Sequence, residues 1–324
     1  MRWLVNTCGL RWNRLLLAAV VVFTAVELLL LMAWGGLFEP RRQVLIHADD
    51  AGLCAAVNEA TIRGLEEGLV SSTSIMVPCP GFEEFARYAV AHPERDFGVH
   101  LVLTAENRSI RWGPVLKEGV ASLMQPDGSF WHKSEQVAEH ARADEAEQEL
   151  RAQVQQALDR GIRTSHLDHH MWVLLQRPDL LEVYVRLGEE FRLPIRLHRT
   201  FTPSECGAAL QDRAIYERLI QPAVARGTPL MDFIDSNNYH VRPNRKLSHY
   251  VNALRSLPPG LSEIVIHCSV NRPGLPLPGA ADRRAADTAV FTSKEIRDEI
   301  RRLGLQVVGW KDLRPASVPA KRGT

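Results

Sequence analysis

Short apolar runs alternate with helical patterns along most of this 324-residue chain, and this alternation constrains the fold most strongly. Eight of the runs have the length and composition of buried strands. They lie at residues 44–47, 72–77, 97–101, 164–167, 194–197, 230–234, 264–267 and 306–309. Strands separated by helices pair in parallel, so the count predicts an α/β fold of the (β/α) barrel type. A doubly wound open sheet is the alternative.

Helical patterns fill most of the intervals between these runs. We expect helices at residues 55–68 and 139–160, the second a long charged helix that ends at Gly161. A helix at residues 293–303 begins with Ser293 as its N-cap and ends at Gly304. Residues 104–134 match neither pattern, and a loop of this length inside a compact domain is usually functional.

The segment at residues 15–38 is almost wholly apolar, with Glu27 as its only charged residue. At 1.5 Å per residue such a helix is long enough to cross a bilayer, so we expect a transmembrane anchor after a short tail at residues 1–14. The flanking arginines favour an N-terminus inside and a domain on the non-cytoplasmic side of the membrane. A cleaved signal peptide or a start site placed too far upstream are the alternatives.

The remainder of the chain is expected to form one domain at residues 44–313 and a disordered tail at residues 314–324. The formal net charge is +1 without a long basic run, which argues against nucleic acid as a partner. The five cysteines are scattered and include no C-x-x-C pair, so neither a disulfide framework nor a structural zinc site is predicted.

Side chains that can bind metals recur where the predicted strands end. In a parallel α/β fold the carboxyl ends of the strands share one face, which is where such folds place their active sites. Each histidine alone is more often structural, but their coincidence over several strands predicts a site on that face. The residues are His47, Asp49, Asp50, His100, His166, Asp168, His169, His170, His198, Asp235, His240 and His267.

The types of these residues suggest a chemistry. Two imidazoles and one carboxylate form a metal site that leaves positions open for water and substrate. A divalent ion there lowers the pKa of water and polarises a carbonyl oxygen, and a second carboxylate can serve as general base. Asp49 and Asp50 are neighbours in an extended segment, so their side chains leave on opposite sides. The alternative is that one of them caps the following helix.

Three motifs follow one another in the chain: His-Ala-Asp-Asp-Ala-Gly at residues 47–52, Gly-Val-His-Leu-Val-Leu-Thr at 98–104, and His-Leu-Asp-His-His-Met at 166–171. In this order and spacing they resemble the YdjC-like carbohydrate deacetylases, which include chitooligosaccharide and hopanoid-biosynthesis deacetylases. The likeness covers about residues 44–313. It implies a distorted (β/α) barrel and a metal-dependent hydrolase that removes an acetyl group from an N-acetylated sugar, oligosaccharide or glycolipid.

Carried over by position, the resemblance implies that Asp50, His100 and His170 hold the metal and that Asp49 is the base. It implies for His267 the role of an acid that protonates the leaving amine, or of a group that steadies the oxyanion. The metal implied is magnesium, while two imidazoles also suit zinc. The resemblance also permits a homodimer.

The chain departs from the family pattern in three places, at Ala51, His169 and Cys268. Ala51 replaces a common aromatic residue. His169 stands where serine is usual, so either His169 or His170 is expected to face the metal. Cys268 stands where the family turn continues with Pro-Gly, which leaves the role of His267 open.

Several other side chains are candidates for substrate binding. Trp112 and Trp172, with Phe130 and Trp131, offer aromatic faces to a sugar ring, and Arg111 offers a contact to a polar substituent. Packing of the aromatic residues and a solvated arginine are the alternative interpretations. Two rival functions also stay open: hydrolysis of another bond such as a phosphoester by the same metal site, and an inactive, membrane-anchored carbohydrate-binding protein.

Overall fold

The computed structural model describes residues 21–27, 41–107, 109–199, 205–275, 277 and 279–313. It divides the chain into two compact units, Met1–Arg41 and Arg42–Thr324. The tails predicted at residues 1–14 and 314–324 lie outside the described residues.

The prediction of a transmembrane helix is wrong for the part of residues 15–38 that the structure describes. Of that span the structure describes residues 21–27, which are helical. Among all described residues, no helix is both long and apolar enough to cross a membrane. This finding also corrects the predicted membrane anchor and the predicted single-pass membrane location. The rest of the predicted span lies outside the described residues.

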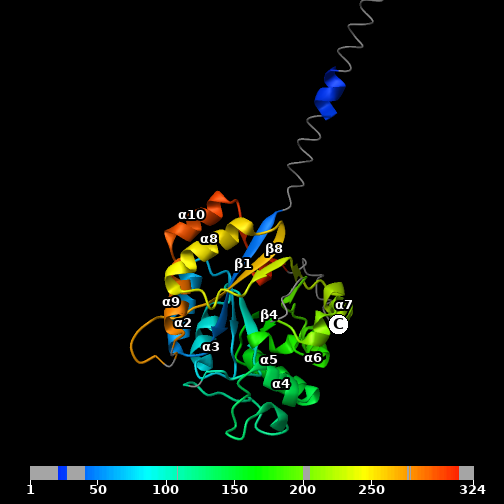
Figure 1. Cartoon of the computed structure of the whole chain (residues 1–324), viewed down its shortest axis with the longest axis vertical. Coiled ribbons are helices and arrows are strands. Elements are labelled where there is room, and N and C mark those ends of the chain that lie inside the picture. The colour runs from blue at the N-terminus through cyan, green and yellow to red at the C-terminus, as the bar shows by residue number, and fades with distance from the viewer. Residues whose placement is uncertain are drawn as a thin grey trace, which may run out of the picture. The chain divides into compact units, whose positions relative to one another are not determined.

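The second unit is built on parallel strands surrounded by helices (Figure 1). Six strands lie side by side in the order β4-β3-β2-β1-β8-β7, and β9 pairs with the start of β1. Their bounds are β1 Arg42–Ala51, β2 Ser72–Ile75, β3 Phe97–Leu101, β4 Thr164–His169, β7 Phe233–Asp235, β8 Gly260–His267 and β9 Gln306–Val307. All these pairs are parallel, as strands joined by helical crossovers should be.

A second, two-stranded sheet bridges the two ends of this array. It consists of β5 (Leu197–His198) and β6 (Leu230–Met231). Ile195, just before β5, forms a bridge to Leu167 of β4, and β6 is separated from β7 by Asp232 alone. The strands therefore follow one another around an irregular, barrel-like circuit that is interrupted at its short strands.

The helices cover the outside of the strands (Figure 1). Ser293 caps α10 by accepting a hydrogen bond from the Ile296 N–H at 3.4 Å, as predicted. The single helix expected at residues 139–160 is two helices, with Ala141 in an extended conformation between them. The helix bounds are α2 Ala55–Glu66, α3 Phe82–Ala91, α4 Ser134–His140, α5 Ala143–Asp159, α6 Pro178–Glu190, α7 Arg213–Ala225, α8 Lys246–Ser256, α9 Ala281–Phe291 and α10 Lys294–Arg302.

Strand β1 shows how the fold positions the polar residues. Its even-numbered residues Ile46 and Ala48 belong to the main apolar core. Its odd-numbered residues face the other way, because successive side chains of a strand alternate. Leu45 lies in a small apolar cluster with Met231 and Trp310, and the next two residues on that face are His47 and Asp49. The same face is therefore apolar near the start of β1 and charged near its end.

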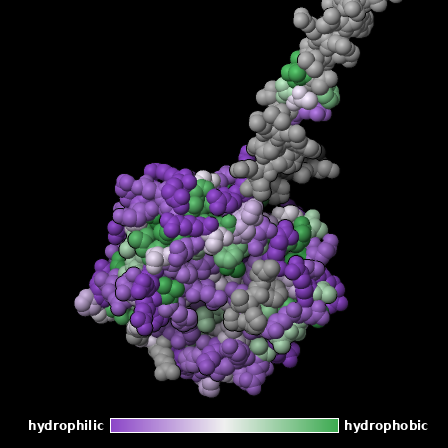
Figure 2. All heavy atoms as spheres, turned by 45° about the horizontal axis from the view of Figure 1, so that its top comes forward, coloured by the Kyte–Doolittle hydropathy of each residue, from purple (hydrophilic) through white to green (hydrophobic). Residues whose placement is uncertain are grey.

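The outside of this unit is of ordinary polarity. On the face drawn in Figure 2, hydrophobic residues are interspersed among hydrophilic ones. Large hydrophobic side chains that are exposed in this unit include Val90, Leu158, Phe233 and Leu247. Single exposed side chains of this kind are normal for a folded domain.

Candidate functional site

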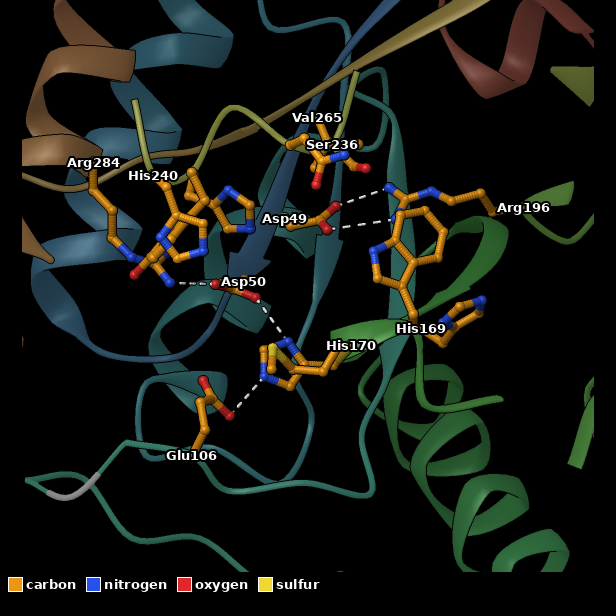
Figure 3. A pocket seen from close by; sticks show the side chains of 15 residues that line it. Asp49, Asp50, Glu106, His169, His170, Arg196, Ser236, His240, Val265 and Arg284 are labelled. Atoms are coloured by element: carbon orange, nitrogen blue, oxygen red, sulfur yellow. Dashed lines mark hydrogen bonds and ion pairs between the residues drawn. The ribbon is translucent and has the colours of Figure 1, made fainter. Parts of the chain in front are cut away.

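A cavity of about 320 Å³ lies where β1, β4 and β8 end. Of the residues expected at the site, it is lined by Asp49, Asp50, His169, His170, Trp172, His240 and His267 (Figure 3). Its volume is at the lower end of the range for pockets that take small molecules. The cavity lies at the carboxyl ends of the strands, on the face of the barrel where the sequence predicted a site.

Three of the predicted residues converge on one point. Oδ1 of Asp50 lies 3.4 Å from Nε2 of His100 and 3.3 Å from Nδ1 of His170, and the two ring nitrogens are 3.3 Å apart. In the described part of the chain, this oxygen is buried and has no hydrogen-bond donor. One carboxylate and two imidazoles that point at a common centre suit a divalent metal ion, so these residues fit the implied group.

The far nitrogen of each of these imidazoles is engaged by a carboxylate. Nδ1 of His100 lies 2.8 Å from Asp168 and 3.0 Å from the Ser74 hydroxyl. Nε2 of His170 lies 2.9 Å from Oε2 of Glu106. Such partners orient metal-binding histidines and fix the nitrogen that carries the proton.

Charge around these residues favours a cation. Burial would lower the pKa of His100, but Asp168 and Asp49 outweigh burial and raise it to about 9. Burial would raise the pKa of Asp50, but Arg284 and the neighbouring histidines hold it well below its usual value. The site therefore stabilises positive charge at its centre, and Asp50 is ionised.

His169 and His170 are separated by the end of β4. His169 packs edge-on against Trp172 and Tyr184, with ring centroids 5.6 and 5.1 Å apart. Burial lowers its pKa well below the usual value, so its ring is neutral. The structure thus brings His170, and not His169, to Asp50 and His100.

Asp49 lies beside this cluster, with its Oδ2 3.9 Å from Nε2 of His100, and it is held from the barrel interior. Arg196 donates to its Oδ1 at 2.8 Å, and Nε2 of His47 lies 3.3 Å from the same oxygen. Burial would raise the pKa of Asp49, but Arg196 and His100 outweigh burial and hold it well below its usual value. Asp49 is therefore an ionised carboxylate beside the cavity, with its orientation set by Arg196.

The backbone of β1 is irregular at Asp50, because the register with β2 shifts between Ala48 and Ala51. Asp50 has φ 69°, in the left-handed region that few residues other than glycine adopt. Met171 and Trp172 are in the same region, both with φ 54°. Backbone strain of this kind persists where the surroundings hold it, and it is concentrated here at the cavity.

Three charged residues of the site, Glu106, Arg196 and Arg284, were not found from the sequence. Arg196 is 2% exposed and also contacts Asp168 at 2.9 Å and Glu263 at 3.2 Å. Arg284 of α9 donates to Oδ2 of Asp50 at 2.6 Å. A lone arginine inside the predicted strand at residues 194–197 was the available signal for Arg196, whereas nothing in the sequence pattern distinguishes Arg284.

The remaining candidates are divided. Trp172 lines the cavity, and His267 does so from the end of β8, beside Asp49 in the strand register. Arg111 is paired with Asp127 at 2.8 Å and is not among the lining residues. Trp112 is 4% exposed and packs in the core, away from the cavity lining. Phe130 is fully buried, and Trp131 stacks on His140.

Comparison with known proteins adds three findings. A family model described as YdjC-like protein matches residues 43–302. A carbohydrate deacetylase of Thermus thermophilus is 36% identical over 263 residues, which cover 79% of this chain and 89% of that protein. A carbohydrate deacetylase of Geobacillus stearothermophilus is 35% identical over 162 residues, or 50% of this chain and 62% of that relative.

A solved structure has a similar fold. It is an Enterococcus faecalis protein described as a cellobiose-phosphate cleavage protein. The TM-score is 0.69 at 25% identity, and the match covers 85% of this chain and all of that one.

Proposed function

The chain belongs to the YdjC-like protein family, and from this membership we propose that it is a metal-dependent carbohydrate deacetylase. The observation that carries the proposal is the convergence of Asp50, His100 and His170 beside an ionised Asp49. The substrate proposed is an N-acetylated sugar or oligosaccharide, and the reaction is hydrolysis of its acetamide bond.

Asp50, His100 and His170 would hold the metal, each through one atom at the common centre. What a divalent ion supplies when bound there is polarisation of the acetyl carbonyl and a lower pKa of water. Family resemblance favours magnesium, and the two imidazoles equally suit zinc.

Asp49 would take the proton from the attacking water. Its carboxylate is ionised and adjoins the cavity, and Arg196 holds it in one orientation, which supports this role. The proton that Asp49 receives is then available to the leaving nitrogen, so the products are acetate and a free amino sugar. Transfer by a positioned group of this kind typically contributes a factor of about 10²–10⁴ to the rate.

His267 would act as a hydrogen-bond donor to the developing oxyanion. Burial lowers its pKa to about 4, so the ring is neutral at pH 7. A neutral imidazole keeps an N–H to donate but carries no extra proton for the amine. Of the two roles implied by resemblance, stabilisation of the oxyanion is therefore the better supported.

Trp172 would form the wall against which a sugar ring packs. It lines the cavity and is itself flanked by His169 and His198, with ring centroids 5.6 and 5.1 Å away. An aromatic face suits the apolar C–H face of a sugar ring.

The proposal is tested with the purified full chain, loaded separately with magnesium and with zinc. N-acetylglucosamine and its β-1,4-linked oligomers serve as substrates, and acetate and free amine are both measured. Equal amounts of the two products are expected, with none after metal removal. Hydrolysis of p-nitrophenyl phosphate without release of acetate would favour the phosphoesterase alternative, and binding of sugar without any turnover would favour an inactive carbohydrate-binding protein.

A further inference from the structure

Glu106 is the only residue of the long 104–134 loop that lines the cavity, among those the structure describes. Its Oε2 lies 2.9 Å from Nε2 of His170, on the side of the ring that faces away from Asp50 (Figure 3). Its side chain is 32% exposed, whereas that of His170 is 7% exposed. A carboxylate at the cavity rim thus contacts the buried imidazole from outside.

This contact determines which nitrogen of His170 is free to bind a cation. A carboxylate accepts hydrogen bonds and cannot donate them, so Nε2 must carry the hydrogen. Nδ1, which lies 3.3 Å from Oδ1 of Asp50, is then left with its lone pair toward the common centre. Without Glu106 a neutral ring could place its hydrogen on either nitrogen, and one of the two forms cannot bind a metal.

The other histidine of the cluster has an equivalent partner of different origin. Asp168, 2.8 Å from Nδ1 of His100, is fully buried in β4 and is part of the barrel itself. Glu106 lies after β3, outside regular secondary structure. Its position therefore depends on how the loop is held.

The loop is held next to Glu106 by three hydrogen bonds. Trp112 donates from its indole nitrogen to the Thr104 carbonyl at 2.8 Å. The Ala105 N–H donates to the Trp131 carbonyl at 2.7 Å, and Nδ1 of His132 contacts the Ala105 carbonyl at 2.8 Å. The backbone just before Glu106 is thus fixed from several directions, and Trp112 has a structural task here.

We propose that Glu106 is a positioning residue of the metal site, and that the 104–134 loop holds its carboxylate against His170. The proposal rests on the proposed function only in taking Asp50, His100 and His170 as the metal ligands. Outer partners of this kind change metal affinity by about 10–100-fold when they are removed.

The test measures metal affinity and the protonation of the His170 ring. Magnesium and zinc affinities are measured for the wild-type chain, Glu106→Gln and Glu106→Ala, and ¹⁵N spectra of the zinc-loaded proteins report which nitrogen of His170 carries the hydrogen. We expect about 10-fold or greater loss of affinity in Glu106→Ala and a smaller loss in Glu106→Gln, whose amide oxygen can still accept from Nε2. Glu118→Ala, an exposed residue of the same loop, is the matched control.

Trp112→Phe tests whether the loop positions Glu106, because it removes the indole donor and keeps an aromatic ring. We expect a loss of metal affinity smaller than that of Glu106→Ala, with none in Glu118→Ala. Unchanged affinity in Glu106→Ala, with its melting temperature retained, would overturn the proposal. Metal binding without release of acetate would overturn the proposed function and leave this inference standing, because its readout is metal affinity. A wild-type chain that binds neither metal would overturn both.

Discussion

Asp49 and Asp50 are covalent neighbours with different surroundings. Asp50, with its positive φ, turns to His100 and His170, while Asp49 continues the inward face of β1 and meets Arg196. One carboxylate is thereby available as a ligand and the other as a base. Asp50 also carries the local irregularity of β1, since the register with β2 shifts between Ala48 and Ala51.

The adjacent histidines give a direct test of the ligand set. His170→Ala removes an atom from the common centre, and we expect metal affinity to fall by more than the roughly 10–100-fold of an outer partner. His169→Ala is the matched control, since His169 contacts Trp172 and Tyr184 and not Asp50. Equilibrium dialysis with magnesium and zinc measures both variants, and the opposite ranking would mean that His169 is the ligand.

At the scale of the elements, buried charges tie the strands together. Arg196, just before β5, contacts Asp49 of β1, Asp168 of β4 and Glu263 of β8. These side chains are almost completely buried. A buried charge is tolerated only when it is paired, so this arginine allows three carboxylates to share the barrel interior.

Removal of that arginine should therefore destabilise the protein strongly. Arg196→Met leaves the three carboxylates with His47 as their remaining cationic partner, and we expect a loss of about 3–5 kcal/mol in the free energy of unfolding. Arg199→Met removes an exposed pair with Asp232 and should cost about 1 kcal/mol or less. Chemical denaturation compares the two variants, and equal losses would show that the interior network contributes no more than a surface pair.

The turn after β4 carries two strained residues in succession. Met171 has φ 54° and is 45% exposed, and its carbonyl accepts from the Ser134 hydroxyl at 2.6 Å. Met171→Gly relieves the backbone strain and keeps that hydrogen bond, so we expect stability to be unchanged or raised by about 1 kcal/mol. Thermal unfolding measures the effect. A clear loss of stability would mean that the methionine side chain packs more than its exposure indicates.

Comparison of particular elements shows what sequence reasoning could reach. Buried strands were located within a few residues because continuous apolar runs bounded by turns mark them. The break between α4 and α5 was missed because no glycine or proline stands there; the Arg142 N–H instead donates to the Ser122 hydroxyl at 2.9 Å. Arg284 was missed because its partner Asp50 is 234 positions away, and such pairs follow from the fold and not from local pattern.

At the scale of the whole molecule, the interior of the barrel is apolar near the start of β1, charged farther along the strand, and open at the cavity where the strand ends. Trp310 and Leu45 lie in the small apolar cluster, His47 and Glu263 are fully buried, and Asp49 borders the cavity. This order places ionisable groups where their protonation is linked to folding. Stability should therefore depend on pH through groups that never touch solvent.

The raised pKa of His47 sets the direction in which stability changes with pH. Burial would lower its pKa, but Asp168 and Asp49 outweigh burial and raise it from 6.5 to about 9. The protonated ring thus stabilises the fold fully below about pH 6.5, and this contribution is lost as the pH rises through about 9. We expect the metal-free protein to lose about 1–3 kcal/mol of unfolding free energy over this range. Denaturant titrations of the wild-type chain and His47→Gln measure it, and identical pH profiles would contradict the assignment.

The central claim is that Asp50, His100 and His170 hold a metal at which Asp49 acts as base in deacetylation. Its most direct test measures metal content and acetate release in the same samples of wild-type protein and Asp49→Asn, with N-acetylglucosamine oligomers as substrate. We predict that Asp49→Asn retains the wild-type metal content and loses turnover by about 10²–10⁴-fold. Loss of the metal together with activity would show that the two aspartates have exchanged roles, and full activity in Asp49→Asn would contradict the account.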